Sequence, residues 1–356
     1  MIGDRCPGNV IVDRALLVLQ THDHMRSPNI LPMSAFAAIM ALTACNKDEV
    51  HYGGPSTTSD HALAIVEQAR VAATQAFSVN AAQGGSFISD QGTVITIAPN
   101  AFIGQDGGTV VGQVDIELIE AMDVGDMVRL NLQTVAMGTG GDKVLLQSGG
   151  ELRLRAEQFG EQVTVAPGMA QLHIPAGEPD PLMRRFIGAE VENGNVLWQD
   201  DGELVLDSLV FLGEDTVGGG GWLQGDYYTT PWPSQGSGGT WPDYGYINCD
   251  HPLPPGGDST DVTITVPQQF SNWGCTVWIV VPEIDCMVYM EAWNGNVVRA
   301  GFPLRIGLQG TIVAFSEQGG QYQASFTPIT ITDDHQQTIT LQATSLQAYQ
   351  SALDAL

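Results

Sequence analysis

The sequence is poor in basic residues. It has 13 Lys and Arg against 40 Asp and Glu, which gives a formal net charge of −27 at pH 7. An electric field of that sign repels nucleic acid and anionic lipid headgroups, so we expect no nucleic-acid partner. Charged residues make up only 15% of the chain, whereas hydrophobic residues make up 43%. This hydrophobic content is sufficient for packed cores and excludes a chain that is disordered throughout.

The sequence also lacks the short motifs that carry catalytic chemistry. It contains no nucleophile elbow, H-E-x-x-H motif, Walker loop or dinucleotide fingerprint. The glycine pairs Gly140-Gly141 and Gly149-Gly150 are expected as turns between strands. His173 lies in "QLHIP" and is expected to be an ordinary strand residue rather than a base. We therefore expect neither an enzyme nor a cofactor.

No spacing typical of a metal site is present either. Clustered carboxylates could hold Ca²⁺, which prefers several loop oxygens. None of these clusters has the spacing of an EF-hand, so we expect solvated loops and no metal site. The clusters are Asp200-Asp201, Asp258 with Asp261, and Asp333-Asp334.

No hydrophobic run in the sequence is long enough to span a membrane, because a membrane-spanning helix needs about 20 apolar residues. The longest run, Ile30 to Ala44, has fifteen mostly apolar residues and ends at Cys45. This length is typical of the hydrophobic region of a secretory signal peptide, and a buried core helix is the alternative. Arg26 supplies the preceding positive charge if translation starts at Met25 rather than at Met1.

The end of this run carries the most specific signal. "LTAC", residues 42–45, resembles the lipobox of bacterial lipoproteins. The resemblance implies that Cys45 is lipidated, that the chain is cleaved before it, and that the protein is anchored to a membrane. Each buried acyl CH₂ contributes about 0.8 kcal/mol, so two or three chains anchor firmly. "NKDE" after Cys45 resembles a surface-export tag of one Gram-negative phylum, whereas an ordinary tether is the alternative. We expect an outer-membrane protein, at the cell surface rather than on the periplasmic face.

Cysteines are few, and their number suggests one disulfide. Of five cysteines, Cys6 precedes the expected translation start. Beyond the lipidation site, Cys249, Cys275 and Cys286 remain, an odd number for an oxidising compartment, so we expect two of them to be bonded. A hairpin around "PEID" would pair Val281 with Cys286 and leave Cys275 off register, so a bond from Cys249 is equally plausible. No C-x-x-C spacing is present, which disfavours zinc.

Alternation of apolar and polar residues predicts an all-β fold. Segments such as "GTVITIAPNAF" and "GQVDIELIEA" are typical of half-buried antiparallel strands. We expect two β-sandwich domains in tandem, with a short N-terminal helix in "HALAIVEQARVAATQAF" and a short C-terminal helix in "SLQAYQSALDAL". Thr344 or Ser345 would cap the C-terminal helix, and Gly319-Gly320 would form a hairpin turn. The expected divisions are 1–44 (doubtful start and signal peptide), 45–79 (tether and helix), 80–217 (first sandwich), 218–246 (connection) and 247–356 (second sandwich).

The expected connection is rich in glycine, proline and aromatic residues. Rings beside carboxylates could stack on sugar faces, but rings of an irregular segment commonly pack over a junction, and we favour packing. The residues that would form a sugar-binding surface are Trp222, Tyr227, Tyr228, Trp232, Trp241, Tyr244 and, at its end, Tyr246.

Two passages resemble a known group of proteins. "GTVITIAPNAFIGQDGGTVVGQVDIELIEA" resembles a β-sandwich domain of bacterial cell-surface lipoproteins, itself similar to the sandwich of netrin receptors and ankyrins. "IAPNAF" carries Pro99 and Ala101 of its Ile-Pro-x-x-Ala motif, but Ala98 intrudes before Pro99 and only Asn100 separates Pro99 from Ala101. "YGYINCDHPLPP", "FTPITITDD" and the terminal helix look like the C-terminal half of the same group. The resemblance covers about residues 80–356 and implies no catalytic residues.

These observations together predict a lipid-anchored cell-envelope protein. Its expected role is non-enzymatic binding or scaffolding, with an envelope protein or a glycan as partner. The alternative is a carbohydrate-binding accessory lipoprotein that uses the aromatic connection.

Overall fold

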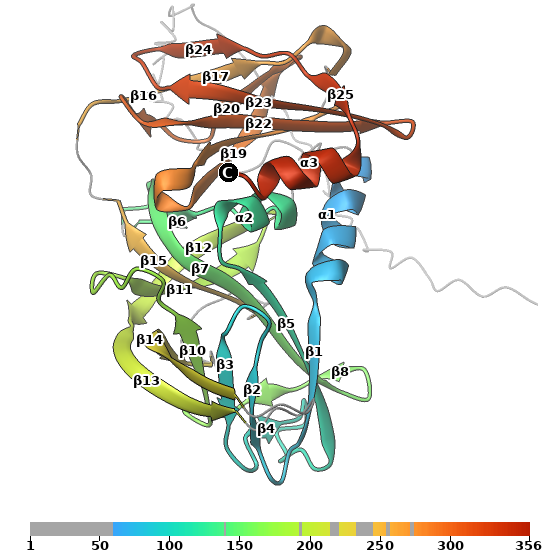
Figure 1. Cartoon of the computed structure of the whole chain (residues 1–356), viewed down its shortest axis with the longest axis vertical. Coiled ribbons are helices and arrows are strands. Elements are labelled where there is room, and N and C mark those ends of the chain that lie inside the picture. Colours follow the sequence, from blue (N-terminus) through green and yellow to red (C-terminus); the bar gives the residue numbers. More distant parts are fainter. Residues whose placement is uncertain are drawn as a thin grey trace, which may run out of the picture. The chain divides into compact units, whose positions relative to one another are not determined.

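The computed structural model describes residues 60–138, 140–191, 194–213, 221–232, 245–253, 257–270 and 274–356. All of them belong to one compact unit, His51–Leu356. The fold is all-β with a short helix near each end of the described chain, as predicted (Figure 1). Cys45 and the segment expected to be a signal peptide lie outside the described residues.

A first sheet has eight strands, and part of it closes on itself. Strand β7 pairs with β15 and with β6, β6 runs parallel to β12, and β12 pairs with β11, which pairs with β15. These five strands therefore form a closed ring, to which β5 and β1 add on one side of β7. The members are β1 (Gln75–Asn80), β5 (Gln113–Ala121), β6 (Val135–Met137), β7 (Lys143–Gln158), β8 (Glu161–Gln162), β11 (Arg184–Glu190), β12 (Val196–Glu203) and β15 (Tyr246–Pro252).

A second sheet of five strands packs against the first. Leu152 and Ile247 of the first sheet share an apolar core with Ile95, Leu172 and Tyr228 of the second. Full burial of one such side chain contributes about 1.5–3 kcal/mol. In order across the sheet, the strands are β13 (Val205–Gly213), β14 (Gly221–Pro231), β10 (Ala170–Pro175), β3 (Val94–Ile97) and β2 (Gly85–Ile88). A short pair, β4 (Phe102–Ile103) and β9 (Thr164–Val165), completes this part.

A third sheet encloses a separate apolar core built by residues such as Ile264, Ile279, Val288 and Ile312. Its strands, in order, are β24 (His335–Thr338), β17 (Val262–Thr265), β20 (Val297–Ala300), β19 (Cys286–Asn294), β18 (Thr276–Val281), β22 (Gln309–Gln318), β23 (Gln321–Thr330) and β25 (Gln342–Thr344). A short pair, β16 (Ser259–Thr260) with β21 (Leu304–Arg305), and two 3₁₀ turns, η1 (Gln268–Phe270) and η2 (Pro282–Ile284), accompany it.

Three short helices lie between the first sheet and the third (Figure 1). They are α1 (Asp60–Ala73), α2 (Val124–Leu130) and α3 (Leu346–Leu353). A shared apolar cluster joins them to both sheets and includes Met127 of α2, Tyr349 of α3, Trp198 of β12 and Trp278 of β18. Of the helices that the structure describes, none combines the length and the apolar character needed to span a membrane.

The N-terminal helix is shorter than predicted. The apolar spacing extends to Phe77, but α1 ends at Ala73 and Phe77 lies in β1, opposite Ile116 of β5. The Thr74 hydroxyl donates to the Arg70 carbonyl at 2.8 Å and satisfies the last turn of the helix. From Gln75 onward, pairing with β5 stabilises a strand more than the helical spacing of apolar residues stabilises a helix.

Other local predictions are confirmed. Helix α3 begins after Ser345, whose side chain accepts from the Ala348 N–H. Gly319 and Gly320 both have positive φ and form the predicted two-residue turn between β22 and β23. One expectation is corrected: the segment 218–246, expected as an irregular connection, contains a regular strand, because β14 pairs with β13 from Gly213↔Gly221 to Val205↔Thr229. The division into two domains stays a prediction.

Candidate functional site

The aromatic residues singled out from the sequence are buried wherever their side chains are described. Tyr227 and Tyr228 in β14, Trp232 just after it, and Tyr246 in β15 are each at most 6% exposed. Tyr228 also accepts a hydrogen bond from the Asp180 N–H at 2.7 Å. A sugar platform needs exposed ring faces, so these four rings serve packing. Trp222 lies in β14, whereas Trp241 and Tyr244 lie outside the described residues.

The three described cysteines are free thiols. Cys249 lies in β15, Cys275 precedes β18, and Cys286 begins β19 opposite Val281, as the hairpin pairing predicted. The disulfide expected from their number is therefore not present in the structure. Burial raises the pKa of Cys275 and of Cys286 to about 12 and that of Cys249 well above its ordinary value. Buried free cysteines behave as small apolar side chains. An odd number of them therefore does not require a disulfide.

The glycine pair Gly149-Gly150 is not a turn, which corrects the sequence prediction. It lies inside β7, where Asn248 pairs with Glu151 and Asp250 pairs with Ser148. From one pair to the next, β15 advances by two residues and β7 by three. Strand β7 therefore carries one extra residue, which is a β-bulge. Gly150 has φ +125°, and a Cβ there would approach the Met122 sulfur to 2.5 Å, so only glycine fits.

The bulge turns polar side chains toward one another inside the first sheet. In a regular strand, residues three apart point to opposite faces, but here Ser148 and Glu151 both contact Asn248. The Ser148 hydroxyl donates to Asn248 Oδ1 at 3.2 Å. Asn248 Nδ2 donates to Glu151 Oε1 at 3.1 Å and to Asp250 Oδ2 at 2.6 Å. A single amide thus links two carboxyl groups.

Both carboxyl groups of this cluster are removed from solvent. Glu151 and Asp250 are 0% exposed. Burial, and then the charge of Asp250, raises the pKa of Glu151 well above its ordinary range. Burial also raises the pKa of Asp250, against hydrogen bonds from Ser148, the Gly149 backbone and Asn248. Within the described chain, Glu151 Oε2 is buried and has no hydrogen-bond partner.

Sequence reasoning missed this cluster. The available signal was polar residues at inward positions of apolar strands, "SGGE" in β7 and "INCD" in β15. Of the three acidic clusters that the sequence analysis did single out, Asp200-Asp201 forms ion pairs with Arg184 and Arg185. Among the described residues, no three or more His, Cys, Asp or Glu side chains gather as a metal site.

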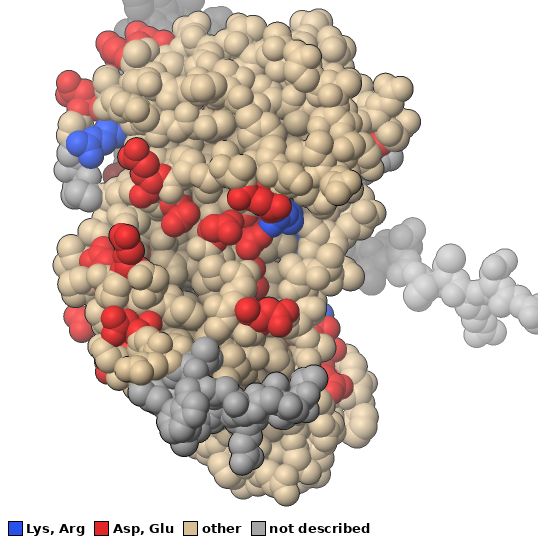
Figure 2. Space-filling model, viewed as in Figure 1, with Lys and Arg blue, Asp and Glu red and all other residues tan. Residues whose placement is uncertain are grey.

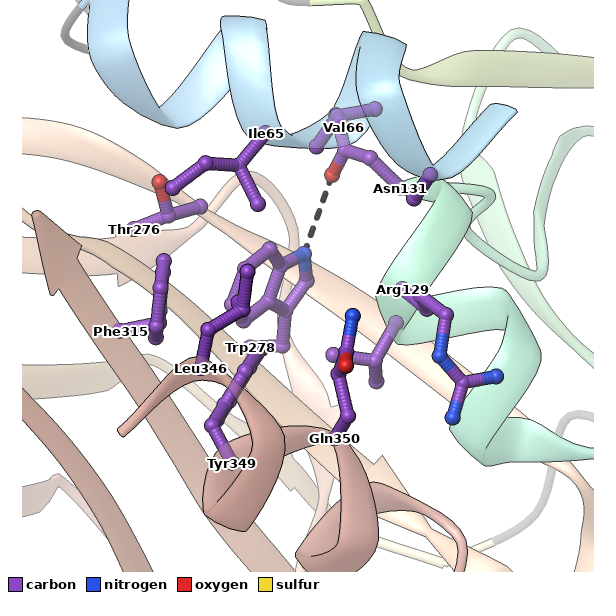
Figure 3. Close-up of a pocket in the computed structure, with 12 residues that line it drawn as sticks. Ile65, Val66, Arg129, Asn131, Thr276, Trp278, Phe315, Leu346, Tyr349 and Gln350 are labelled. Carbon is purple, nitrogen blue, oxygen red and sulfur yellow. Dashed lines mark hydrogen bonds between the residues drawn. The ribbon is translucent and has the colours of Figure 1, made fainter. Parts of the chain in front are cut away.

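The three helices surround a small cavity (Figure 3). The Trp278 indole N–H donates to Asn131 Oδ1 at 3.1 Å, and the rings of Phe315 and Tyr349 stack with centroids 4.2 Å apart. The cavity has a volume of about 30 Å³, which is room for one water molecule. It is too small for an organic ligand.

A wider cleft of about 360 Å³ lies beside this cavity, also along α1 and α2. Glu120 accepts hydrogen bonds there from Ser89 and Gln75, each at 2.7 Å. Asp126 accepts from the Gln91 amide at 3.3 Å, and burial, followed by the charge of Asp123, raises the pKa of Asp126. The polar part of the lining consists of amide and carboxylate groups with Thr74 and Arg129, beside three alanines and Leu130. These polar groups suit hydrogen bonding to a polar partner group.

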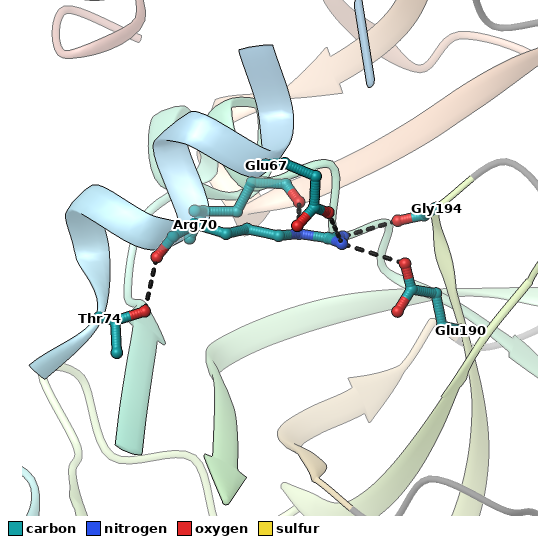
Figure 4. Close-up of polar contacts among 6 residues, drawn as sticks. Glu67, Arg70, Thr74, Glu190 and Gly194 are labelled. Atoms are coloured by element: carbon teal, nitrogen blue, oxygen red, sulfur yellow. Dashed lines mark hydrogen bonds and ion pairs between the residues drawn. The ribbon is translucent and has the colours of Figure 1, made fainter. Parts of the chain in front are cut away.

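A buried arginine fixes α1 to the folded body (Figure 4). Arg70 is 4% exposed and donates to the carbonyls of Leu130 at 3.1 Å and Gly194 at 2.6 Å. Its guanidinium also pairs with Glu67 at 2.9 Å and Glu190 at 3.1 Å. One side chain thus joins three separate segments of the chain.

The surface carries the acidic excess of the sequence. On the face shown in Figure 2, acidic side chains are spread over the surface and outnumber basic ones. Acidic surfaces favour cationic partner groups and disfavour anionic ones.

Comparison with known proteins adds no assignment. No protein-family model matches this chain, and none of the curated proteins matches it.

Proposed function

We propose that this chain is a lipid-anchored bacterial envelope protein with a non-enzymatic binding or scaffolding role. The observation that carries the proposal is the sequence from Ile30 to Cys45, an apolar run that ends in "LTAC". We place the protein at the outer membrane, on the cell surface rather than the periplasmic face, because "NKDE" follows the cysteine.

The number of residues between the proposed anchor and the folded body supports this role. The described structure begins at Asp60, so 14 residues separate it from Cys45. A chain of that length spans at most about 50 Å. An anchored body would thus stay within about 50 Å of the membrane surface.

The attachment of α1 supports a firm mechanical connection between the proposed anchor and the sheets. A tether that leads into a loosely held helix would peel it away under tension. Arg70 instead bonds this helix to Leu130 and Gly194 from buried positions. Tension from a lipid anchor would therefore reach the sheets through α1.

The acidic cleft beside α1 supports the binding part of the proposal. Its amide and carboxylate groups could hydrogen-bond to hydroxyl or amine groups of an envelope glycan or protein. The described aromatic rings do not favour the sugar-stacking alternative, because they are buried.

Substitution of the lipidation cysteine tests the anchor. Cells are labelled with radioactive palmitate, and the protein is partitioned between detergent and water. We expect Cys45→Ser to abolish the label and to move the protein out of the detergent phase. Cys6→Ser is the matched control and should leave both unchanged, since residue 6 precedes the expected start. A Cys45→Ser protein that still carries the label would refute the proposal.

A further inference from the structure

We propose that the turn between β7 and β8, together with Val111, inserts the Phe159 ring into an apolar pocket of a partner protein whose rim is basic. We call this surface the apolar tip; its residues are Val111, Phe159 and Gly160. The inference rests on the proposed binding role and deepens it, because it names the surface that binds and the chemistry of its partner. It does not depend on the lipid anchor.

The apolar tip exposes two large apolar side chains. Phe159 is 95% exposed and Val111 is 72% exposed. The Gln158 side-chain amide donates to the Val111 carbonyl at 2.8 Å and to the Gln113 carbonyl at 2.9 Å. These two hydrogen bonds hold the segment that carries Val111 beside the end of β7. A surface that is ordered before binding loses less conformational entropy when a partner binds.

The backbone at Phe159 is unfavourable for a large side chain. Gln158 pairs with Glu161, so Phe159 and Gly160 form a two-residue turn, with φ angles of 57° and 80°. Turns of this kind favour Asn or Gly at the first position, and a bulky residue there is rare. The exposed ring gains no burial in return. Residues held in rare backbone conformations cluster at binding and active sites, so the tip is a candidate for recognition.

The charge around the apolar tip determines which partner fits it. Asp115 lies opposite Glu157 in the β5–β7 pair, and Glu161 directly follows the turn. Arg155 pairs with Glu157, so negative charge remains in excess. An acidic rim is repelled by anionic lipid headgroups and by a second copy, which has the same net charge of −27. It is complementary to a pocket edged by Lys or Arg.

The apolar tip lies near the end of β1 that is farther from α1 (Figure 1). Strand β1 follows α1 at Gln75 and ends at Asn80, which pairs with Gln113. The Gln113 carbonyl is one of the two that Gln158 binds. A partner can therefore reach the tip without displacing α1, through which the chain from the proposed anchor enters.

The experiment introduces the photocrosslinker benzoylphenylalanine at position 159 of the full chain in intact cells. We expect a protease-sensitive adduct with one protein species, which mass spectrometry identifies and which is then purified. A second chain carries the crosslinker at Gln350, which lines the acidic cleft. If only the Gln350 chain captures a protein, the tip inference is wrong while the proposed binding role stands.

The variant Phe159→Asn separates recognition from folding. Asn before Gly is favoured in such a turn, so Tm should rise by about 2 °C. Affinity for the purified partner, measured by isothermal titration calorimetry, should fall by roughly thirtyfold or more, as for a hot-spot residue. Added salt should weaken wild-type binding. Trp293→Asn is the matched control at another exposed ring, 55% exposed in β19, and should neither raise Tm nor weaken binding.

Each of the following results would overturn the inference. Adducts of position 159 with lipid would assign the tip to a membrane, and adducts with a second copy would assign it to self-association. No adduct at all would show that nothing contacts the tip in cells. A lower Tm of Phe159→Asn would show that the ring packs on its own chain. A partner that binds Phe159→Asn as tightly as wild type would show that the crosslink reported proximity alone.

Discussion

At the scale of single residues, burial decides what the aromatic side chains of the 218–246 segment do. Trp232 is 6% exposed and belongs to the core between the first and second sheets. Its backbone N–H donates to the Ala170 carbonyl at 3.0 Å, which fixes it beside β10. A ring held in this way cannot offer a face to a sugar.

We expect Trp232→Ala to lower the free energy of unfolding by about 3–5 kcal/mol, because it removes a large buried side chain and leaves a cavity. The measurement is urea denaturation followed by circular dichroism. Trp293→Ala is the control and should change stability by less than about 1 kcal/mol, since Trp293 is 55% exposed. A Trp232→Ala chain as stable as wild type, with altered glycan retention, would favour the sugar-binding alternative.

At the scale of elements, one side chain supplies the buried hydrogen bonds that attach helix α1. Arg70 reaches α2 through the Leu130 carbonyl and the β11–β12 connection through the Gly194 carbonyl. The rest of the contact surface of α1 is apolar, with Val66 buried and Ile65, Ala69 and Ala73 partly buried. The guanidinium therefore supplies the directional contacts of this helix.

We expect Arg70→Met to lower the free energy of unfolding by about 2–4 kcal/mol. The variant keeps the apolar stem but leaves two carbonyls and Glu190 without their donor. Hydrogen exchange should show the loss first in the amides of α1. Arg184→Met is the control and should cost less than about 1 kcal/mol, because the Arg184–Asp200 pair is partly exposed. Equal losses in the two variants would contradict this role.

The sequence predicted those elements whose signal is local. Helix α3, its Ser345 cap and the Gly319-Gly320 turn follow from spacing and turn chemistry, and all three are confirmed. Helix α2 was missed because it has only seven residues; its Asp123 cap and left-handed Asn131 were its only signals. The Ser148–Asp250 cluster was missed because residues about 100 positions apart form it. Single-sequence periodicity does not report which strands become neighbours.

At the scale of the whole molecule, buried thiols link stability to pH. Burial raises the pKa of Cys286 to about 12, whereas an exposed thiol has a pKa near 8.5. Below pH 8 both the folded and the unfolded states hold the proton, so stability is unaffected. Between about pH 9 and 12 only the unfolded state loses its proton, which favours unfolding.

We expect the free energy of unfolding to decline above about pH 9. Cys286→Ala should make this decline with pH less steep by roughly 1 kcal/mol per pH unit. Urea denaturation at pH 8, 9 and 10 measures both slopes, and their difference cancels the titration of other groups. The same slope in variant and wild type would show that Cys286 titrates alike in both states.

The closed ring of the first sheet also sets the order in which the molecule is completed during synthesis. Leu152 of β7 cannot pair with Ile247 of β15 until the ribosome has made 95 further residues. At about 5–20 residues per second, a ribosome needs roughly 5–20 s to make that interval. Until then β7 lacks one neighbour and the Glu151 carboxyl group lacks Asn248, so the first sheet cannot close. For the proposed exported lipoprotein, this delay would keep the nascent chain unfolded for long enough to be threaded through a membrane translocation channel.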